Sequence, residues 1–490
     1  MAGAGLAGIS TALACADAGL EVTLLESRPR LGGRTASFRR SGIGGDPEVD
    51  LDIDTGQHVF LRCCRSYLAL LDRLGVADQV YLQPRLDVPV LVPGGTAGVR
   101  ITRGRGPAPL HLAGALARYR LLSPGRRLRL ARAALALRGV DPNGPGVDEQ
   151  SFGDWLARHG QDAGTIAALW DLITVATLNS PARDSSLALA ATVFQLGLLT
   201  DARAGDLGWA TVPLGRLHGT AAWSRLTEAG VQIRTGTKVS GLARDQHGWT
   251  VSLGGGGPVS GCGPVSGGGP VSGGGPVSGG GSVTARWVVL AVPPPAAERL
   301  LPPGALALPA GWPDRLSSSP IVNVHVIYDR PVLTEPFLAA VGSAVQWVFD
   351  RTGPSGLPPG AGQYLAVSLS AARDLIGRPA REIIDQIRPE LSALLPAARS
   401  ASVREAFVTR EPAATFAPAP GTARWRPPAR TTAPGLFLAG AWTATGWPDT
   451  MEGAVRSGNT AAATLITQAR LDLPARLRPE LVQLTTEVSA

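Results

Sequence analysis

The chain has 490 residues and carries 46 lysines and arginines against 38 aspartates and glutamates, a formal net charge of +8 with histidine neutral. Apolar residues make up 44% and charged residues only 17%, which excludes disorder along the whole chain and allows more than one hydrophobic core. Nucleic acid is not an expected partner, because the arginines are scattered and no nucleic-acid-binding motif accompanies them.

Cysteine usage and hydropathy together indicate where the protein works. Cys15, Cys63, Cys64 and Cys262 show neither metal-ligand spacing nor a disulfide framework, so we expect a reducing compartment and no bound metal. No signal peptide is expected, and the longest apolar run, 187–199, is too short to cross a bilayer. We predict a cytoplasmic protein that is soluble or contacts the inner face of the membrane.

The predicted elements alternate between helix and strand at the N-terminus, which is typical of an α/β fold. A helix is expected over 6–18 and a strand over 21–26, followed by mostly helical sequence over 66–199. Later elements are strands over 231–239, 321–328, 345–349, 364–369 and 435–439 and a final helix over 449–470. The middle of the chain therefore favours an α+β arrangement.

One segment differs in composition from the rest. Between 254 and 281 a Gly-Pro-Val-Ser-Gly unit recurs, and such a density of glycine and proline cannot bury a core. We interpret the segment as a flexible insert without a functional role. It separates two strand patterns, over 249–253 and 283–292, which we expect to pair as a hairpin.

A glycine pattern at the N-terminus points to a dinucleotide site. Gly3, Gly5 and Gly8 fit the spacing G-x-G-x-x-G and open the first predicted helix, whose N-terminus would face a pyrophosphate. Glu26 ends the next strand, roughly 20 residues further on, where a carboxylate accepts hydrogen bonds from ribose hydroxyls. The sequence therefore predicts dinucleotide binding, against the simpler interpretation of a glycine-rich helix start.

The strand that should feed this glycine turn is nearly absent from the sequence. Only Met1 and Ala2 stand before Gly3, so we expect a sheet that lacks its central strand. Two explanations remain open: the start codon lies further upstream, or this polypeptide binds its cofactor poorly. We favour the first, because the rest of the fingerprint is intact.

A second glycine pair and the C-terminal region together carry a family resemblance. The runs concerned are 26–34 (ESRPRLGGR), 436–440 (LFLAG) and 451–458 (MEGAVRSG). They resemble the flavin-containing amine oxidase and phytoene desaturase superfamily, which implies FAD as the cofactor and the N-terminal amides of the last helix, at Met451, facing the flavin. A helix N-terminus carries about half a positive charge, which would stabilise negative charge on reduced flavin.

The spacing and the resemblance assign FAD contacts to both glycine pairs, the ribose carboxylate, a loop glycine, an adenine-side valine and the C-terminal segment. These residues are Gly3, Gly5, Leu6, Ala7, Gly8, Glu26, Gly32, Gly33, Arg34, Gly56, Val239, Gly440, Ala441 and Met451. One departure concerns Ala441, because many members of the superfamily have an aspartate there that binds the ribityl or phosphate region.

A narrower resemblance is to the squalene-associated FAD-dependent desaturases, the hydroxysqualene dehydroxylases of hopanoid synthesis. It rests on the runs 56–61, 170–179, 320–325, 346–351 and 443–454. The resemblance implies reduction of hydroxysqualene to squalene, a squalene-type lipid substrate and a functional link to a squalene-forming synthase. A carotenoid desaturase, with hydride transfer in the opposite direction, and a flavin-free isoprenoid carrier remain alternatives.

Amine oxidation is not expected from the same superfamily. Its amine-oxidising members use a lysine beside the flavin, and the only lysine of this chain, Lys238, is predicted on the adenine side. The leucine- and alanine-rich middle of the chain suits an apolar tunnel for a lipid, with an ordinary helical core as the alternative.

Removal of an allylic hydroxyl as water needs an acid, a hydride at about 3–3.5 Å and a dry apolar channel. His58 is the preferred acid, because imidazole titrates near neutrality and the loop over 54–58 matches a segment beside the flavin in the resembled superfamily. A histidine bonded within its own loop is the simpler interpretation. Asp449 and Glu452 are alternative acids, although acids in a first helical turn are common for structural reasons.

Five further residues are candidates for the substrate pocket. They are Trp170, Asn179, His325, Gln346 and Trp347. Core packing is the alternative for both tryptophans, and a satisfied sheet histidine is the alternative for His325.

Two surface features are also expected. His218 is predicted in a surface helix. The segment 119–138 combines arginines with leucines, which favours a helix pair lying in a membrane interface, or simply a surface helix packed by its leucines.

We expect two interleaved domains. The Rossmann-like FAD-binding domain combines 1–80, 205–295 and 425–470, the α+β substrate domain combines 81–204 and 296–424, and a tail follows over 471–490. The sequence does not reveal the electron donor, the direction of hydride transfer or the oligomeric state.

Overall fold

The computed structural model describes residues 1–43, 49–94, 98–254 and 281–471. The predicted insert therefore lies outside the described residues except for Gly254 and Gly281. The predicted C-terminal tail lies outside them except for Leu471.

A parallel sheet is assembled from four short strands that are far apart in the sequence. They are β1 Thr23–Leu25, β9 Gln232–Arg234, β13 Val288–Leu290 and β19 Leu436–Leu438. β1 pairs with β9, and β13 pairs with β19, both in parallel. β13 and β19 are buried along their whole length, as expected for strands covered on both faces.

Met1 and Ala2 occupy the position between β1 and β13. The Met1 carbonyl accepts the Leu25 N–H at 2.9 Å, and the Ala2 N–H donates to the Val289 carbonyl at 2.9 Å. Ala2 thereby bridges in parallel to both neighbouring strands. The expectation of a sheet without its central member was wrong, because two residues make ladder bonds to neighbours that are themselves only 3 residues long.

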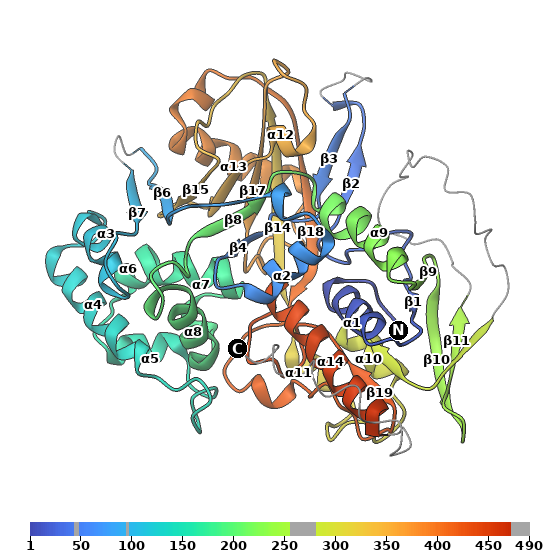
Figure 1. Cartoon of the computed structure of the whole chain (residues 1–490). Helices are drawn as coiled ribbons and strands as arrows, with labels where there is room; N and C mark the ends of the chain where they lie inside the picture. Colours follow the sequence, from blue (N-terminus) through green and yellow to red (C-terminus); the bar gives the residue numbers. More distant parts are fainter. Residues whose placement is uncertain (44–48, 95–97, 255–280, 472–490) are drawn as a thin grey trace.

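Helix α1, Leu6–Asp17, packs against α14, Met451–Leu471, so the blue and red helices of Figure 1 lie side by side. Small residues make this approach close: a Cβ on Gly458 would lie 2.4 Å from the Ala7 carbonyl oxygen. The Thr11 hydroxyl also donates to the Gly458 carbonyl at 3.0 Å. The two predicted terminal helices are confirmed.

A three-stranded antiparallel sheet stands beside the parallel one. Its strands are β10 Lys238–Arg244, β11 Trp249–Gly254 and β12 Ser282–Ala285. Trp249 lies opposite Ala285 across β11 and β12, so the hairpin predicted on either side of the insert is confirmed.

The second large sheet has seven strands in the order β18-β14-β17-β16-β15-β6-β7. Their bounds are β6 Asp87–Leu91, β7 Val99–Thr102, β14 Ser319–Tyr328, β15 Phe337–Ala340, β16 Trp347–Asp350, β17 Gln363–Leu369 and β18 Val403–Thr415. The strands predicted over 321–328, 345–349 and 364–369 are confirmed. β6 and β7 correct the prediction of mostly helical sequence over 66–199, because their valines pair antiparallel at a sheet edge.

The two faces of this sheet have different neighbours. On one face, the three valines of β14 pack with Ile387 of α13, Ala380–Leu394. Because side chains alternate along a strand, Asn323 and His325 face the opposite side. On that opposite face, Asn323 Nδ2 lies 3.7 Å from the position that a Cβ on Gly56 would take.

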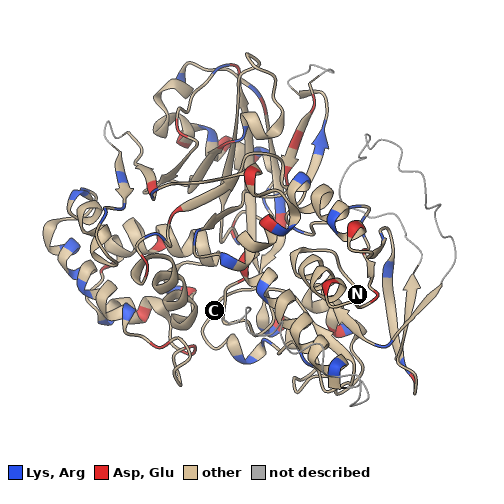
Figure 2. Cartoon of the chain, in the orientation of Figure 1, with Lys and Arg blue, Asp and Glu red and all other residues tan. Residues whose placement is uncertain are grey.

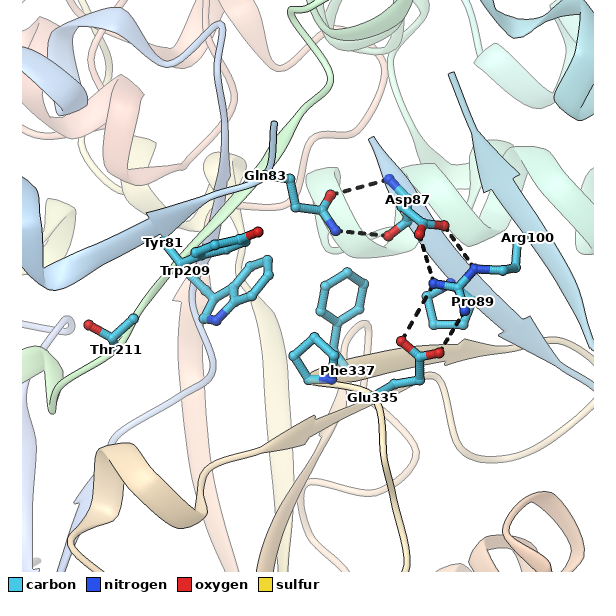
Figure 3. A pocket seen from close by; sticks show the side chains of 10 residues that line it. Tyr81, Gln83, Asp87, Pro89, Arg100, Trp209, Thr211, Glu335 and Phe337 are labelled. Carbon is cyan, nitrogen blue, oxygen red and sulfur yellow. Dashed lines mark hydrogen bonds and ion pairs between the residues drawn. The ribbon is translucent and has the colours of Figure 1, made fainter. Parts of the chain in front are cut away.

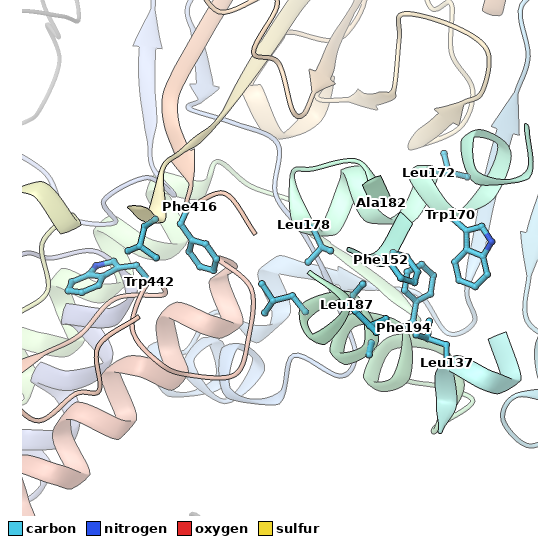
Figure 4. Packing of buried hydrophobic residues seen from close by; sticks show 14 of the residues in the cluster. Leu137, Phe152, Trp170, Leu172, Leu178, Ala182, Leu187, Phe194, Phe416 and Trp442 are labelled. Atoms are coloured by element: carbon cyan, nitrogen blue, oxygen red, sulfur yellow. The ribbon is translucent and has the colours of Figure 1, made fainter. Parts of the chain in front are cut away.

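A helical block adjoins the sheet at its edge strand, where α3 contacts β7. Its helices are α3 Ala113–Arg118, α4 Pro124–Arg138, α5 Phe152–Arg158, α6 Ala163–Thr165, α7 Asp171–Leu178 and α8 Leu187–Phe194. Trp170 packs edge-on against Phe152 and Phe194, with ring centroids 5.7 and 5.0 Å apart. Figure 4 shows the same apolar cluster extending to Phe416 and Trp442.

The remaining elements connect these parts. They are α2 Arg65–Leu74, α9 Ala221–Glu228, α10 Pro294–Leu300, α11 Trp312–Leu316, α12 Thr352–Ser355, β2 Ser37–Arg40, β3 Leu51–Asp54, β4 Val59–Leu61, β5 Val80–Leu82 and β8 Leu207–Ala210. β2 pairs with β3, and β4, β8 and β5 form a small sheet. The boundaries of the two interleaved domains stay a prediction.

Candidate flavin and substrate site

The glycine turn before α1 contains two kinds of glycine. Gly3 has a φ of +100°, and a Cβ there would lie 2.3 Å from the Ala291 carbonyl oxygen, while a Cβ on Gly8 would lie 1.9 Å from the Gly3 carbonyl oxygen. Protein packing therefore requires both. Gly5 differs, because its φ is −76° and a Cβ would meet only the Gly33 Cα, at 3.9 Å. The space beside Gly5 suits a pyrophosphate that approaches the backbone.

The N-terminus of α1 is open to an anion. Gly5 caps the helix without a side chain, and the first turn holds no acidic residue, so no side chain of α1 itself neutralises the positive end of the helix dipole. Leu6 and Ala7 are buried in this turn and can offer only backbone amides. Beside the turn, the Glu26 carboxylate accepts the Ala4 N–H at 2.7 Å, the place predicted for a ribose contact.

The second glycine pair packs onto the first turn. The Gly32 N–H donates to the Ala4 carbonyl at 2.9 Å, and Gly33 has a φ of +59°. The next carbonyl, of Arg34, accepts the Thr55 hydroxyl at 2.5 Å. This bond brings the loop after β3 to the end of the predicted pyrophosphate site.

The C-terminal segment meets the same loop at Asp449. The Arg34 guanidinium lies 3.8 Å from the Asp449 carboxylate, just before α14 begins at Met451. The Gly440 N–H, after β19, donates to the Ser457 hydroxyl on α14 at 2.8 Å. The two ends of the described chain therefore converge on one site, as the resemblance implies.

Ala441 and Val239 are the remaining cofactor candidates. Ala441 is buried, and its carbonyl accepts the Arg426 guanidinium at 2.9 Å, so this position offers no carboxylate to FAD. Val239 is half-buried on β10. Its predicted contact with the adenine stays a prediction.

His58 lies in the loop after β3. Its Nδ1 is 2.9 Å from the Gly56 carbonyl oxygen, which can only accept, so Nδ1 carries a proton. Nε2 has no hydrogen-bond partner among the described residues. Burial lowers the pKa of His58 below 6.5; Asp54 opposes this shift and Arg351 adds to it. The ring is thus neutral at pH 7 and, once protonated, a stronger acid than free imidazole.

The two alternative acids have different surroundings. Asp449 accepts the Phe416 N–H at 3.0 Å, and burial raises the pKa of its carboxyl above 3.8. Glu452 is fully enclosed: it accepts the Tyr67 N–H at 2.7 Å in the first turn of α2 and pairs with Arg456 at 2.6 Å. Glu452 therefore caps the start of α2, and its role as an acid stays a prediction.

Trp170 and Asn179 are both hydrogen-bonded within the protein. The Trp170 Nε1–H donates to Gln161 at 3.0 Å, and the ring is 2% exposed. Asn179 has a φ of 55°, donates to the Ser319 carbonyl at 2.9 Å and accepts the Ala371 N–H at 2.6 Å. Both amide ends of Asn179 are thus occupied by backbone.

Gln346 and His325 are also engaged inside the protein. Gln346 bonds the Ser370 N–H and carbonyl at 2.7 and 3.0 Å. His325 is fully buried between the Tyr364 hydroxyl at 2.7 Å and the Thr409 hydroxyl at 2.9 Å, and burial lowers its pKa to about 3. All four residues thus make structural contacts, and their role in a substrate pocket stays a prediction.

His218 corrects another expectation, because it is fully buried and not in a surface helix. Its Nδ1 lies 3.1 Å from the Thr35 carbonyl and its Nε2 lies 2.9 Å from the Tyr67 hydroxyl. Burial lowers its pKa to about 4. The preceding leucine, Leu217, is also buried, so both residues belong to the support beneath the second glycine pair.

Trp347 remains as a candidate wall residue. It is half-buried, and its ring centroid lies 6.3 Å from Phe349 and 6.1 Å from Phe337. These three rings give one face of the sheet an aromatic surface.

A pocket of about 380 Å³ opens at the outer end of this surface (Figure 3). Phe337 and Trp209 lie on its wall with ring centroids 5.4 Å apart. Arg100 closes its rim through ion pairs to Asp87 at 2.8 Å and to Glu335 at 2.6 Å.

Two features of the site were missed by the sequence analysis. Asp54 and Arg351 form a salt bridge of 2.8 Å next to the His58 loop. Asn323 is completely buried, and neither its Nδ2 nor its Oδ1 finds a partner among the described residues; Gln57 Nε2 is similarly unpartnered. The signal for Asn323 was present, because a lone amide stands among the valines of a buried strand.

Comparison with known proteins identifies the architecture. The family described as flavin containing amine oxidoreductase matches residues 6–466, which include the second glycine pair, the seven-stranded sheet and most of α14. The seven-stranded sheet lies within the predicted substrate domain and is called the substrate sheet below. The chain belongs to the flavin-containing amine oxidoreductase family. Within this family, it is 28% identical over 470 residues to a hydroxysqualene dehydroxylase of Rhodopseudomonas palustris, a match that covers 96% of this chain and 98% of the relative.

Other members are similar to a comparable extent. The chain is 26% identical over 508 residues to the zeta-carotene desaturase of Zea mays, covering 94% of this chain and 82% of the relative. Among solved structures, an oxidoreductase from Methanosarcina mazei superposes with a TM-score of 0.68 at 17% identity, covering 94% and 99%. Cyclohexylamine oxidase from Brevibacterium oxydans gives 0.66 at 18% identity, covering 96% and 98%. The predicted fold is confirmed.

This flavin-containing amine oxidoreductase is an FAD-dependent oxidoreductase, as predicted. The residues present fit the cofactor. The space beside Gly5 and the start of α1, which no side chain caps, can take a pyrophosphate. The buried Gln57 Nε2 has no hydrogen-bond partner among the described residues and can donate to a ligand. In the described part of the chain, no helix has the length and apolar character needed to cross a membrane.

Proposed function

We propose that this oxidoreductase removes the hydroxyl group of a squalene-type alcohol and converts hydroxysqualene to squalene. The observation that carries the proposal is His58, whose Nε2 has no hydrogen-bond partner among the described residues. Its loop lies against Asn323 of the substrate sheet, on either side of Gly56. Loss of a hydroxyl needs an acid, since hydroxide leaves poorly, whereas taking hydride from a hydrocarbon needs none. The similarity to hydroxysqualene dehydroxylases over nearly the full chain supports this choice.

In the proposed reaction the C–O bond breaks and its electron pair leaves with the oxygen. His58 gives that oxygen a proton from Nε2, so the oxygen departs as water. Reduced FAD, when bound, supplies the hydride that forms the new C–H bond and is itself oxidised by two electrons. His58 returns to its neutral form and is reprotonated from solvent.

Asp449 is the second acid candidate. It lies at the start of α14, and its raised pKa means that it holds a proton at a higher pH than a free aspartate does. His58 is preferred, because Asp449 already accepts a backbone N–H and faces Arg34.

Exclusion of water is the second requirement of the reaction, because water would return an allylic cation to the alcohol. The buried rings of Trp442 and Phe416 lie close to α14, and the apolar cluster continues from them into the helical block (Figure 4). The Trp442 Nε1–H is satisfied by the Val292 carbonyl at 3.1 Å. The rings of Trp442 and Phe416 thus offer an apolar surface on which the indole N–H is already hydrogen-bonded.

The runner-up is a carotenoid-type desaturase. The similarity to the zeta-carotene desaturase of Zea mays supports it at nearly the same identity. An isoprenoid carrier without flavin finds no support, since the chain belongs to a flavin-dependent family.

A contact with the membrane surface would deliver such a lipid. On α4, Leu128 and Leu135 are 55% and 56% exposed. Leu130 and Leu137 are buried on the opposite face of the same helix. Figure 2 shows arginines distributed along the same helix. We propose that α4 rests on anionic lipid at the inner membrane face, and that a synthase forming the squalene skeleton supplies the substrate.

The test is product analysis under anaerobic conditions with chemically reduced FAD. Hydroxysqualene should yield squalene in one turnover with matched oxidation of the flavin, while phytoene and zeta-carotene with oxidised FAD should yield no new double bonds. Desaturated carotenoid without any squalene would replace the proposal by its runner-up.

A further inference from the structure

Asn323 carries an amide group that the protein leaves unsatisfied. The residue is 0% exposed, and within the described ranges neither Nδ2 nor Oδ1 has a hydrogen-bond partner. Thr409 lies opposite Asn323 on the neighbouring strand β18, but its hydroxyl is hydrogen-bonded to His325 Nε2 at 2.9 Å. Native proteins rarely retain a buried amide without partners unless a ligand or water completes it.

Gly56 indicates the side from which such a ligand would come. A Cβ there would meet only side-chain atoms, His58 Cε1 at 3.5 Å and Asn323 Nδ2 at 3.7 Å. These are ordinary contact distances and the φ of Gly56 is not in the left-handed range, so neither packing nor backbone conformation demands a glycine. A side chain would, however, fill the space between the imidazole and the amide.

We propose that the Asn323 amide binds the hydroxyl group of the substrate and so distinguishes an isoprenoid alcohol from an isoprenoid hydrocarbon. This inference rests on the proposed function for the class of ligand. A hydroxyl is a small group that offers a lone pair to Nδ2 and a proton to Oδ1. The amide is closed off from water, and Gly56 leaves the approach to it free of a side chain.

The position of Asn323 in the sheet suits both ends of such a ligand. Strand register places Ser368 opposite Asn323 and Trp347 opposite Ser368, so all three share one face. The hydrocarbon chain can lie on the aromatic side of this face while its oxygen stays across Gly56 from His58. A hydrocarbon ligand would bury the amide without satisfying it, which weakens its binding.

The experiment compares binding without turnover. FAD-loaded, oxidised protein is titrated under nitrogen with hydroxysqualene and with squalene in detergent micelles, and tryptophan fluorescence gives each Kd. The unmodified protein should bind the alcohol roughly tenfold to hundredfold more tightly. Asn323→Leu should reduce this preference to less than about threefold, whereas Asn143→Leu, at an exposed position, should leave it unchanged.

The outcomes are separable. Equal affinity of the unmodified protein for both ligands overturns the inference, and this result needs no variant. If Asn323→Leu does not fold, Asn323→Ser should show a preference between the two extremes. A variant that shifts the flavin spectrum but keeps the preference assigns the amide to the cofactor and overturns the inference. Preference for the alcohol without formation of squalene refutes the proposed reaction and leaves the inference standing.

Discussion

Asp54 and Arg351 form a buried salt bridge that joins the end of β3 to the residue after β16 of the substrate sheet. The carboxylate and guanidinium are 2.8 Å apart, with side-chain exposures of 4% and 9%. Asp54 also accepts the Ser37 hydroxyl at 2.6 Å, and Arg351 donates to the Ala210 carbonyl at 2.9 Å. The loop that carries His58 starts at this ion pair, so the pair fixes the candidate acid relative to the sheet.

Arg351→Met should lower the free energy of unfolding by about 3–5 kcal/mol, because it leaves the Asp54 charge buried without its partner. Arg100→Met is the matched control, since the Arg100 ion pairs are 44% exposed on the arginine side and should contribute no more than about 1 kcal/mol. Urea unfolding of both variants measures the difference. Equal losses in the free energy of unfolding would mean that the buried ion pair stabilises the fold no more than the exposed one.

His58→Gln should lower kcat for squalene formation by about 10²–10⁴-fold while FAD content stays normal. Because burial lowers the pKa of His58 below 6.5, the protonated fraction is small at pH 7. The rate of the unmodified protein should therefore rise as the pH falls toward that lowered pKa, and the variant should lose this rise.

Asp449→Asn provides the comparison for the acid. A pH dependence that survives His58→Gln and disappears in Asp449→Asn would transfer the acid role to Asp449. Both profiles need single-turnover oxidation of reduced flavin, so that substrate delivery does not limit the rate.

Stability should fall with pH below about 6.5, because two buried histidines cannot take up protons in the folded state. Burial lowers the pKa of His218 to about 4 and of His325 to about 3, whereas both titrate near 6.5 when unfolded. Each therefore adds a slope of about 1.4 kcal/mol per pH unit between 6.5 and its lowered pKa. Urea unfolding at pH 7, 6 and 5 should show a smaller slope in His218→Gln, and an unchanged slope in the exposed His247→Gln.

Gly5→Ala and Gly3→Ala should separate cofactor binding from folding. At Gly5 an added Cβ meets no protein atom closer than 3.9 Å, so the variant should fold with a Tm near that of the apoprotein and yet retain little FAD. At Gly3 the Cβ would lie 2.3 Å from the Ala291 carbonyl oxygen at a positive φ, so that variant should itself be unstable. Full flavin content in Gly5→Ala would remove this turn from the pyrophosphate site.

The glycine turns could be predicted from the sequence because their determinants are local. Gly3, Gly5 and Gly8 act within one turn, and Glu26 follows on the next strand. The terminal helices and the strands of the substrate sheet were equally accessible, since their apolar periodicity lies within single segments. β6 and β7 were not, because pairing at a sheet edge outweighed the helical character of the surrounding sequence.

The candidate site was less predictable because its partners are remote in sequence. Asp54 and Arg351 are separated by 297 positions, and the role of Glu452 depends on Tyr67, 385 positions away. An acid in a first helical turn looks the same whether it caps a neighbouring helix or donates a proton. Asn323 differs, because an isolated amide among the valines of a predicted strand is visible in the sequence itself.

The parallel sheet has a consequence for how the protein is made. Its last strand, β19, and the helix α14 come from beyond residue 435, yet they pair with β13 and pack on α1. Synthesis must therefore pass β19 and α14 before a nucleotide can be retained, and assembly depends on contacts of high sequence separation, which form slowly. During that interval the emerging polypeptide exposes an unfinished apolar surface, so cellular yield should respond to chaperone supply and to added riboflavin.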